Sequence, residues 1–294
     1  MNKKRYVILT FVIISIILCS NSFYSINNYA DPIIAEDDTL DTEIQEKIDL
    51  EELYTFDYDY KDGYIRYCTE HAILYSQCDY LTEDELREFA KKIDVGIIEI
   101  ETYLNMKLDS ERYINSRIFV NINNSMNEPE FNNENIDMDH TAIISIDDVK
   151  EKKSSYIHEL THLIAWDYNS IWAKEGLAIY LNDKFNAHPT YPNTGYDIDK
   201  LSLQFYNNGT LESMTAFDLL GENVFPNYED VEIEEIFYIF SASFVKYIES
   251  TIGITNFINI YKSQNTKNSL ESITGKSIQI LKDEWINHIK LDGK

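Results

Sequence analysis

Apolar residues recur along the chain at two different spacings, and each spacing predicts one type of element. From residue 82 to residue 104 they come every three or four positions, which predicts a helix with one apolar stripe. The stripe consists of Leu86, Phe89, Ile93, Ile97, Ile100 and Leu104. Thr82 and Glu85 stand three residues apart at its start, as in a capping box. This helix needs a sheet or another helix to cover its stripe.

Shorter apolar runs predict the strands of that sheet. Residues 64–75, 117–122 and 141–146 are rich in aromatic and β-branched side chains. Downstream, helical patterns cover 171–181, 257–261 and 277–289, with Trp285 as a packing anchor in the last. The chain has only 9 Gly and 5 Pro, which argues against a turn-dense all-β architecture. We therefore expect an α+β fold with a small mixed sheet followed by a mainly helical C-terminal subdomain.

The first thirty residues have the pattern of a secretory signal peptide. Lys3, Lys4 and Arg5 precede an apolar run that is too short to cross a bilayer as a helix. Ser20, Ser22 and Ala30 offer small side chains near a cleavage site. We expect an exported, secreted protein with no stable membrane association after cleavage. An uncleaved anchor, or a lipid on Cys19, is the minor alternative.

The charge of the chain is strongly negative and unevenly distributed. With 51 acidic and 25 basic residues the net charge is −26, which argues against nucleic-acid binding through a basic surface. Residues 31–62 hold 13 acidic residues against Lys47 and Lys61. We interpret this segment as an acidic tail or lead-in, either a solvated linker or a docking or pro-segment, and 63–294 as the folded domain.

Removal of the signal peptide leaves two cysteines, Cys68 and Cys78, in the exported chain. An even pair in an exported protein indicates a disulfide, and two unpaired thiols are the alternative.

The residues that indicate chemistry are His158-Glu159-Leu160-Thr161-His162, an H-E-x-x-H sequence in a predicted helix. Asp148 and Glu151 are spaced as a capping box just upstream. Residues four apart lie one turn apart on the same helix face, so both imidazoles can reach one metal ion. Glu159 beside them can take a proton from a water whose pKa that metal has lowered. Two surface histidines on an amphipathic helix are the simpler alternative.

A second helix follows after a short break at 166–170 and contains Glu175 near its start. A catalytic zinc site takes three protein ligands and leaves one position for water. Because a tight helical hairpin brings an early residue of its second helix near the first helix, we expect Glu175 to be the third ligand. Asp167 and Asp183 are the competing carboxylates. Ala165 and Tyr168 stand where the longer pattern with a third histidine would need Gly and His.

The sequence resembles the gluzincin metallopeptidases, in particular the compact peptidase MA-like group related to bacterial collagenase catalytic domains. The resemblance rests on H-E-L-T-H followed by W-A-K-E-G-L-A-I-Y, and on Y-I-F-S-A-S-F-V from Tyr238 onward. It implies a zincin-like fold, Zn²⁺ on His158, His162 and Glu175, and Glu159 as general base. It further implies that Tyr238 stabilises the oxyanion, and that the strand at 141–146 runs along the cleft edge.

We therefore expect a zinc-dependent metallopeptidase that hydrolyses bonds in a peptide or protein substrate. One alternative is a catalytically idle binding module on the same scaffold, and another is a narrowly specific toxin-like protease. Acidic residues lead into the Tyr238 helix, namely Glu229, Asp230, Glu232, Glu234 and Glu235. Negative charge at a helix N-terminus is favourable on local grounds alone. A second interpretation of these acidic residues is that they favour substrates with basic residues near the cleft.

Overall fold

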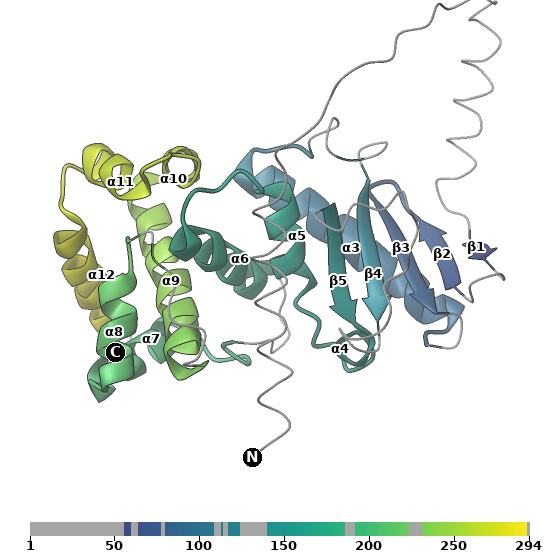
Figure 1. The fold of residues 1–294 in the computed structure, drawn as a ribbon, viewed down its shortest axis with the longest axis horizontal. Coiled ribbons are helices and arrows are strands. Elements are labelled where there is room, and N and C mark those ends of the chain that lie inside the picture. Colours follow the sequence, from purple (N-terminus) through teal and green to yellow (C-terminus); the bar gives the residue numbers. More distant parts are fainter. Residues whose placement is uncertain are drawn as a thin grey trace, which may run out of the picture.

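A computed structural model describes the regular part of the chain. The described residues are 56–59, 64–77, 80–108, 113, 117–123, 140–185, 192–222, 224 and 231–292. They form an α+β structure with a small mixed sheet at one end and helices at the other (Figure 1). The expected fold class is confirmed at this level. The predicted signal peptide at 1–30 and most of the acidic segment at 31–62 lie outside the described residues.

The sheet of the described residues has five strands in sequence order. They are β1 (Phe56–Asp59), β2 (Tyr64–Cys68), β3 (Ala72–Gln77), β4 (Ile118–Asn123) and β5 (Thr141–Ser145). The pairs β1–β2 and β2–β3 are antiparallel, whereas the pairs β3–β4 and β4–β5 are parallel. Since β1 belongs to the segment expected to be a lead-in, the sheet begins upstream of residue 63.

The single strand expected at 64–75 is in fact the hairpin of β2 and β3. The chain reverses without Gly or Pro, at Thr69, whose hydroxyl accepts a hydrogen bond from the Ala72 amide at 2.9 Å. The same hydroxyl donates to Asp94 Oδ1 at 2.6 Å. Asp94 lies on the helix that follows, so this turn ties the hairpin to it. The apolar pattern is continuous through the turn, which is why it predicted one strand.

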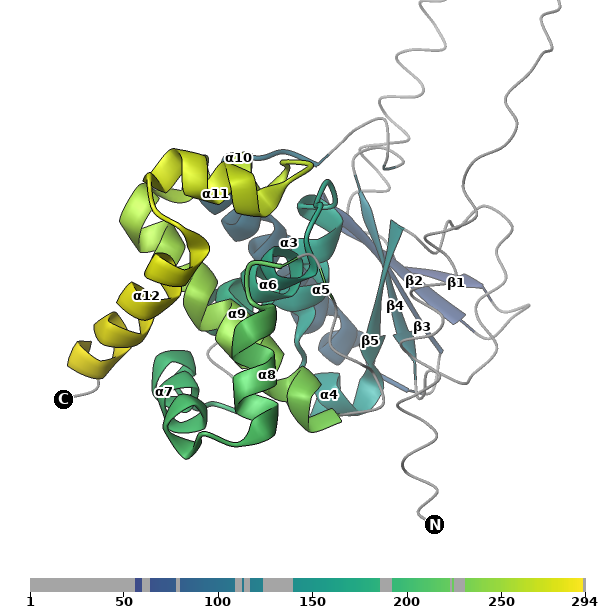
Figure 2. The ribbon, with the colours of Figure 1, turned by 60° about the vertical axis from the view of Figure 1, so that its left-hand side comes forward.

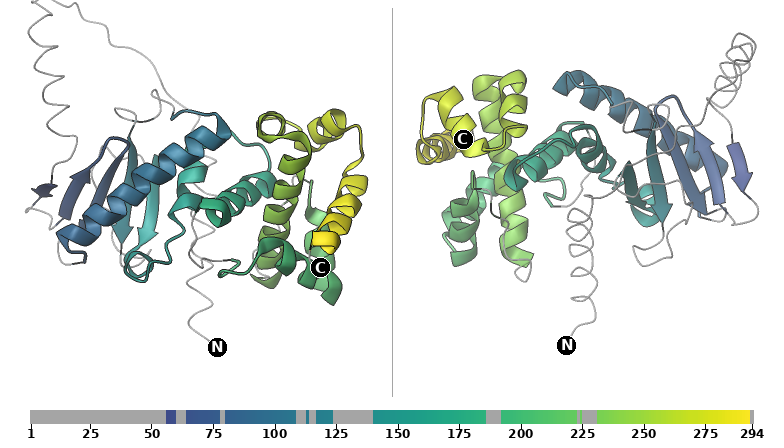
Figure 3. Two further views of the ribbon diagram at one scale, coloured as in Figure 1. Left: turned by 180° about the vertical axis from the view of Figure 1, so that it is seen from behind. Right: turned by 45° about the horizontal axis from the view of Figure 1, so that its top comes forward.

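That helix, α3 (Glu83–Leu104), covers one face of the sheet (Figure 3). The Thr82 hydroxyl accepts from the Glu85 amide and the Glu85 carboxylate accepts from the Thr82 amide, so the predicted capping box is confirmed. All six residues of the predicted stripe are buried. The helix also provides the crossover that a parallel pair such as β3 and β4 requires.

The capping box expected at Asp148 and Glu151 is wrong. Both residues belong to a separate short helix, α4 (Ile146–Lys150), in which Glu151 is the C-cap. Its N-cap is Ser145, whose hydroxyl accepts from the Asp148 amide at 3.4 Å. The H-E-x-x-H helix, α5 (Tyr156–Ile164), begins after Ser155 with no side-chain cap. The prediction assigned Asp148 and Glu151 to the start of α5, but they belong to a one-turn helix that precedes it.

The C-terminal half of the described chain is helical, as expected, and lies on the side of α5 away from the sheet (Figures 1 and 2). Its elements are α6 (Ile171–Phe185), α7 (Ile198–Asn208), α8 (Leu211–Leu219), α9 (Val231–Ile252), α10 (Ile254–Tyr261), α11 (Thr266–Thr274) and α12 (Ile278–Asp292). Trp285 on α12 is fully buried, and its indole donates to the Ser243 hydroxyl of α9 at 2.8 Å. The predicted packing anchor is confirmed.

The central contact of this half is the close approach of α6 and α9. A Cβ built on Gly176 of α6 would lie 2.5 Å from the Ser241 carbonyl oxygen and 2.7 Å from Val245 Cγ2, both on α9. Only glycine leaves room for this backbone contact. The glycine at position 176 therefore permits this contact between α6 and α9.

None of the described helices combines the length and the apolar character that a membrane span requires. Cys68 is buried in β2, whereas Cys78 lies outside the described residues, so the proposed disulfide stays a prediction.

Gly176→Ala should destabilise the protein more than Gly96→Ala by at least about 1 kcal/mol. A methyl group at position 176 meets backbone, which cannot turn away, whereas at position 96 the nearest atom is the end of the Ile157 side chain at 2.7 Å. Both changes gain the same helix propensity, about 1 kcal/mol, so their difference isolates the contact. Urea unfolding of the two variants measures it. Equal losses would contradict the packing argument.

Candidate metal centre

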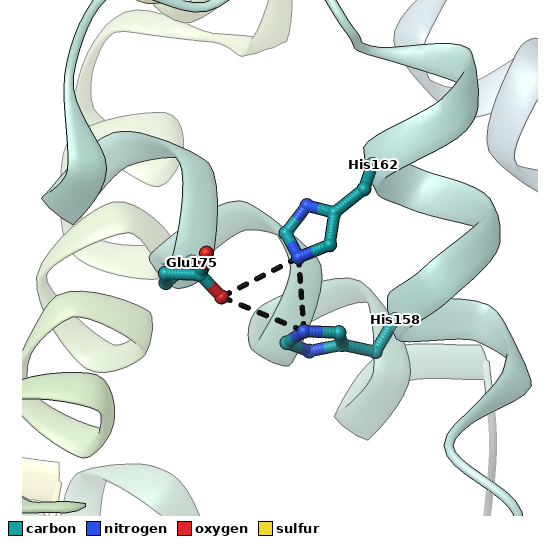
Figure 4. A group of neighbouring side chains, drawn as sticks. All are labelled: His158, His162 and Glu175. Carbon is teal, nitrogen blue, oxygen red and sulfur yellow. Dashed lines mark hydrogen bonds and ion pairs between the residues drawn. The ribbon is translucent and has the colours of Figure 1, made fainter. Parts of the chain in front are cut away.

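Two consecutive helices bring the predicted ligands together. His158 and His162 lie one turn apart on α5, and Glu175 lies near the start of α6. The residues from Trp166 to Ser170 reverse the chain between them, so α6 turns its first turns toward α5. Figure 4 shows both imidazoles pointing at the Glu175 carboxylate. The predicted helical hairpin is confirmed, and the three donor groups lie within 4.8 Å of one another.

The distances among the donor atoms suit a single small ion. The Nε2 atoms of His158 and His162 are 3.0 Å apart. Glu175 Oε2 is 3.5 Å from the first of these atoms and 3.4 Å from the second. Ligands on a tetrahedral ion with bonds of about 2.0–2.1 Å are separated by about 3.3 Å. The three atoms therefore form one face of such a tetrahedron, and they could hold a metal ion without rearrangement.

Two buried tyrosines fix the C-terminal end of α5. The hydroxyl of Tyr113 donates to the Leu163 carbonyl at 2.7 Å, and that of Tyr261 donates to the Ala165 carbonyl at 2.7 Å. The last carbonyls of a helix have no partner within it, so these bonds satisfy groups that would otherwise lie buried and unpaired. They hold the turn that carries His162 in place from two sides.

Lys174 orients the third donor. Its ammonium lies 3.2 Å from Glu175 Oε1, the oxygen that faces away from the histidines, and 4.9 Å from the centre of the Tyr168 ring. With one oxygen held by the lysine, the other is left to face the imidazoles. In metal sites, a neighbouring group outside the ligand set typically orients a ligand in this way.

The electrostatics of the site favour an ionised carboxylate beside a neutral imidazole. Burial and the Lys174 charge lower the pKa of His162 to about 4. Burial alone would raise the pKa of Glu175, but the charges of His162 and Lys174 outweigh it and hold this pKa well below its usual value. Burial also lowers the pKa of His158, but its hydrogen bond to Glu175 and the nearby carboxylates more than compensate and raise it. A metal ion bound here would replace the proton on His158.

Glu159 lies within the electrostatic reach of the same groups but is not one of the clustered donors. The pKa of its carboxyl is raised above its usual value, and burial is the largest cause. The charge of Glu175 raises this pKa further, whereas that of His158 lowers it. The side chain is half-buried. A carboxyl with a raised pKa beside a metal site is suited to accept and return a proton.

Tyr238 lies on α9, and its hydroxyl donates to Glu234 Oε1 at 3.1 Å. It is half-buried and packs against the core. Tyr238 is spaced three residues before Ser241, which touches Gly176, so both are on the face of α9 that packs on α6. Tyr238 thus lies on α9, the helix that packs against the Glu175 helix α6. The catalytic role of Tyr238 stays a prediction.

The competing carboxylates do not join the donors. Asp183, two turns further along α6, accepts from Asn193 Nδ2 at 2.8 Å, and Asp167 is exposed in the loop between the helices. Neither belongs to the metal-binding group found among the described residues.

The sequence did not indicate Lys174, Tyr113 or Tyr261 as parts of the site. A lysine next to a glutamate is too common to stand out, and the two tyrosines reach α5 from distant positions in the sequence. Only an expectation that the ends of α5 need hydrogen-bond partners could have prompted a search for them.

Comparisons with protein-family models, with curated proteins and with solved structures found no match to this chain.

Replacing Glu175 by Gln should weaken binding of one divalent metal ion per chain by about a hundredfold or more, since loss of even an outer partner of a ligand costs up to this much. The amide keeps the size of the side chain but has no charge. Isothermal titration with Zn²⁺ or Co²⁺ measures the change. His288→Ala, at an exposed histidine on α12, is the control and should leave the affinity unchanged. Equal affinity in the Glu175 variant would remove it from the ligand set.

Proposed function

We propose that the protein is an exported, zinc-dependent metallopeptidase with a zincin-like fold. The single observation that carries the proposal is the triangle of His158, His162 and Glu175 donor atoms, with edges of 3.0, 3.5 and 3.4 Å, beside the carboxylate of Glu159. Two nitrogens and one carboxylate oxygen are a donor set typical of catalytic zinc, which leaves a fourth position for water.

The position of the site next to a sheet edge supports a peptide substrate. β5 is the outermost strand of the described sheet on the side of α5 (Figure 1). A strand in this position can pair with an extended peptide backbone through its amides and carbonyls. The same placement was expected from the resemblance to gluzincins.

The division of labour among the side chains follows from their chemistry. When bound, zinc supplies a Lewis acid for the scissile carbonyl and a water of lowered pKa. Glu159 takes the proton of the attacking water and returns a proton to the leaving amine. His158, His162 and Glu175 hold the ion, and Lys174 keeps the Glu175 carboxylate oriented.

Tyr238 is the proposed donor to the oxyanion of the tetrahedral intermediate. A prepositioned hydroxyl is worth most where water is excluded and charge develops. Its hydroxyl donates to Glu234 in the described structure. It must therefore turn away from Glu234 to serve the substrate, and such hydrogen bonds often form only when substrate is bound.

The rival function is a binding module that keeps this scaffold without catalysis. In that case His158, protonated, would bridge His162 and Glu175 as a buried ion pair with no metal. The carboxylate of Glu159 speaks for the enzyme, because a binding module needs no group there that can take a proton from water. A toxin-like protease with one protein target shares the mechanism, and profiling of cleavage products separates it from a general peptidase.

Glu159→Gln should retain one zinc per chain and lower kcat by at least about a hundredfold, since general acid and base catalysis contributes this much or more. The amide cannot take the proton. Cleavage of a peptide library, followed by mass spectrometry, together with metal analysis, checks both parts. Unchanged turnover would contradict the mechanism, and absence of zinc in the wild-type protein would favour the binding module.

Tyr238→Phe should lower kcat by about a hundredfold with little change in KM, because the lost hydrogen bond forms only with the oxyanion. Tyr247→Phe, on the same helix, is the control: that hydroxyl donates to Glu284 on α12. Steady-state kinetics on one cleaved peptide compare the two. Equal effects would show that Tyr238 serves the packing of α9 and not the reaction.

A further inference from the structure

Glu234 stands out among the described acidic residues at the start of α9 because it is buried. Only 8% of its surface is exposed, whereas its neighbour Glu232 is exposed. An acidic side chain that merely complements the helix dipole can do so from the surface, at no desolvation cost. The dipole therefore accounts for Glu232 and not for the burial of Glu234.

Glu234 lies on the face of α9 that packs against α6, the helix that carries Glu175. Glu234, Tyr238, Ser241 and Val245 are spaced by four, three and four residues, so they form one stripe along the helix. The last two touch Gly176, the residue after the ligand Glu175. Tyr238 and then Glu234 continue this stripe toward the N-terminus of α9. The charge of Glu175 is close enough to raise the pKa of Glu234, after the larger effect of burial.

No cation balances this carboxylate within the described residues. The hydrogen bond from Tyr238 satisfies Oε1 at 3.1 Å, and no ion pair to Glu234 occurs in that part of the chain. Among the described residues, the charged group that influences the pKa of Glu234 is another carboxylate, that of Glu175. A buried carboxylate without a positive partner is costly, and a cation brought from outside would repay this cost.

We propose that Glu234 is a specificity-determining residue that receives a cationic group of the substrate next to the metal centre. The inference rests on the proposed peptidase function and deepens it, since it selects substrates with a protonated amine or a guanidinium near the scissile bond. That cation can be a Lys or Arg side chain, or the amino terminus of the peptide. The first source gives an endopeptidase with a basic preference, the second an aminopeptidase.

The test compares matched peptides on matched variants. Each peptide is made with lysine or acetyl-lysine at the positions flanking the scissile bond, and with a free or acetylated amino terminus. Binding is measured by calorimetry on the zinc-loaded Glu159→Gln chain, alone and combined with Glu234→Gln or Glu232→Gln. Gln at 234 still accepts the Tyr238 hydrogen bond, so the fold is retained, as thermal unfolding checks. Glu232→Gln makes the same change of charge two residues away, at the surface.

We expect the cationic peptide to bind about tenfold more tightly than its neutral partner, a ratio that Glu234→Gln reduces to about one and Glu232→Gln preserves. The pair that shows the ratio, lysine or free terminus, identifies the source of the cation. A ratio that survives in Glu234→Gln, or no preference in the parent chain, overturns the proposal.

The same peptides distinguish this failure from failure of the proposed function. Cleavage by the wild-type protein without preference for the cation refutes the role of Glu234 and leaves the peptidase intact. Cation-dependent binding that Glu234→Gln removes, with no cleavage by the zinc-loaded wild type, supports Glu234 and refutes the peptidase.

Discussion

The close approach of α6 and α9 at Gly176 is the contact on which the arrangement of the site depends. Glu175, one residue earlier, must face α5 to meet the two histidines, and this fixes the rotation of α6 about its axis. Gly176 then faces α9, where the Ser241 backbone lies closer than any side chain would permit. With the rotation of α6 and its distance to α9 both set, Tyr238 and Glu234 lie along the same stripe toward the centre. A larger residue at 176 would separate the helices and move that stripe away.

Burial of so many ionisable groups in one place is a constraint of a different kind. Two imidazoles, the carboxylates of Glu159 and Glu175 and the Lys174 ammonium share a partly buried site, where unpaired charge is expensive. Burial and the Lys174 charge lower the pKa of His162 to about 4, whereas the charges of His162 and Lys174 hold the pKa of Glu175 well below its usual value despite burial. In the proposed metal centre, a divalent cation satisfies the same donors without a shared proton.

The sequence predicted the elements whose pattern is local. The stripe and capping box of α3, the H-E-x-x-H helix and the helical hairpin to Glu175 all follow from spacings within about thirty residues, and the structure has each of them. The prediction of a capping box failed at α4, because this one-turn helix is too short to show an apolar periodicity. Its cap is the Ser145 hydroxyl, which accepts from the Asp148 amide. The sequence pattern also merged β2 and β3, because the turn at Thr69 is stabilised by Asp94, 25 residues away, and not by Gly or Pro.

The parts of the site that come from far along the chain could not be predicted in this way. Tyr113 and Tyr261 reach the end of α5 from opposite directions in the sequence, and only the packed structure shows that their hydroxyls complete its hydrogen bonds. Glu234 was one of five similar acidic residues in the sequence, and its burial distinguishes it from Glu232 and Glu235, the other two that the structure describes. The same side chain also holds the Tyr238 hydroxyl. One carboxylate thus links the proposed oxyanion donor to the proposed subsite, and a cation bound at Glu234 would compete with the Tyr238 hydroxyl for its oxygen.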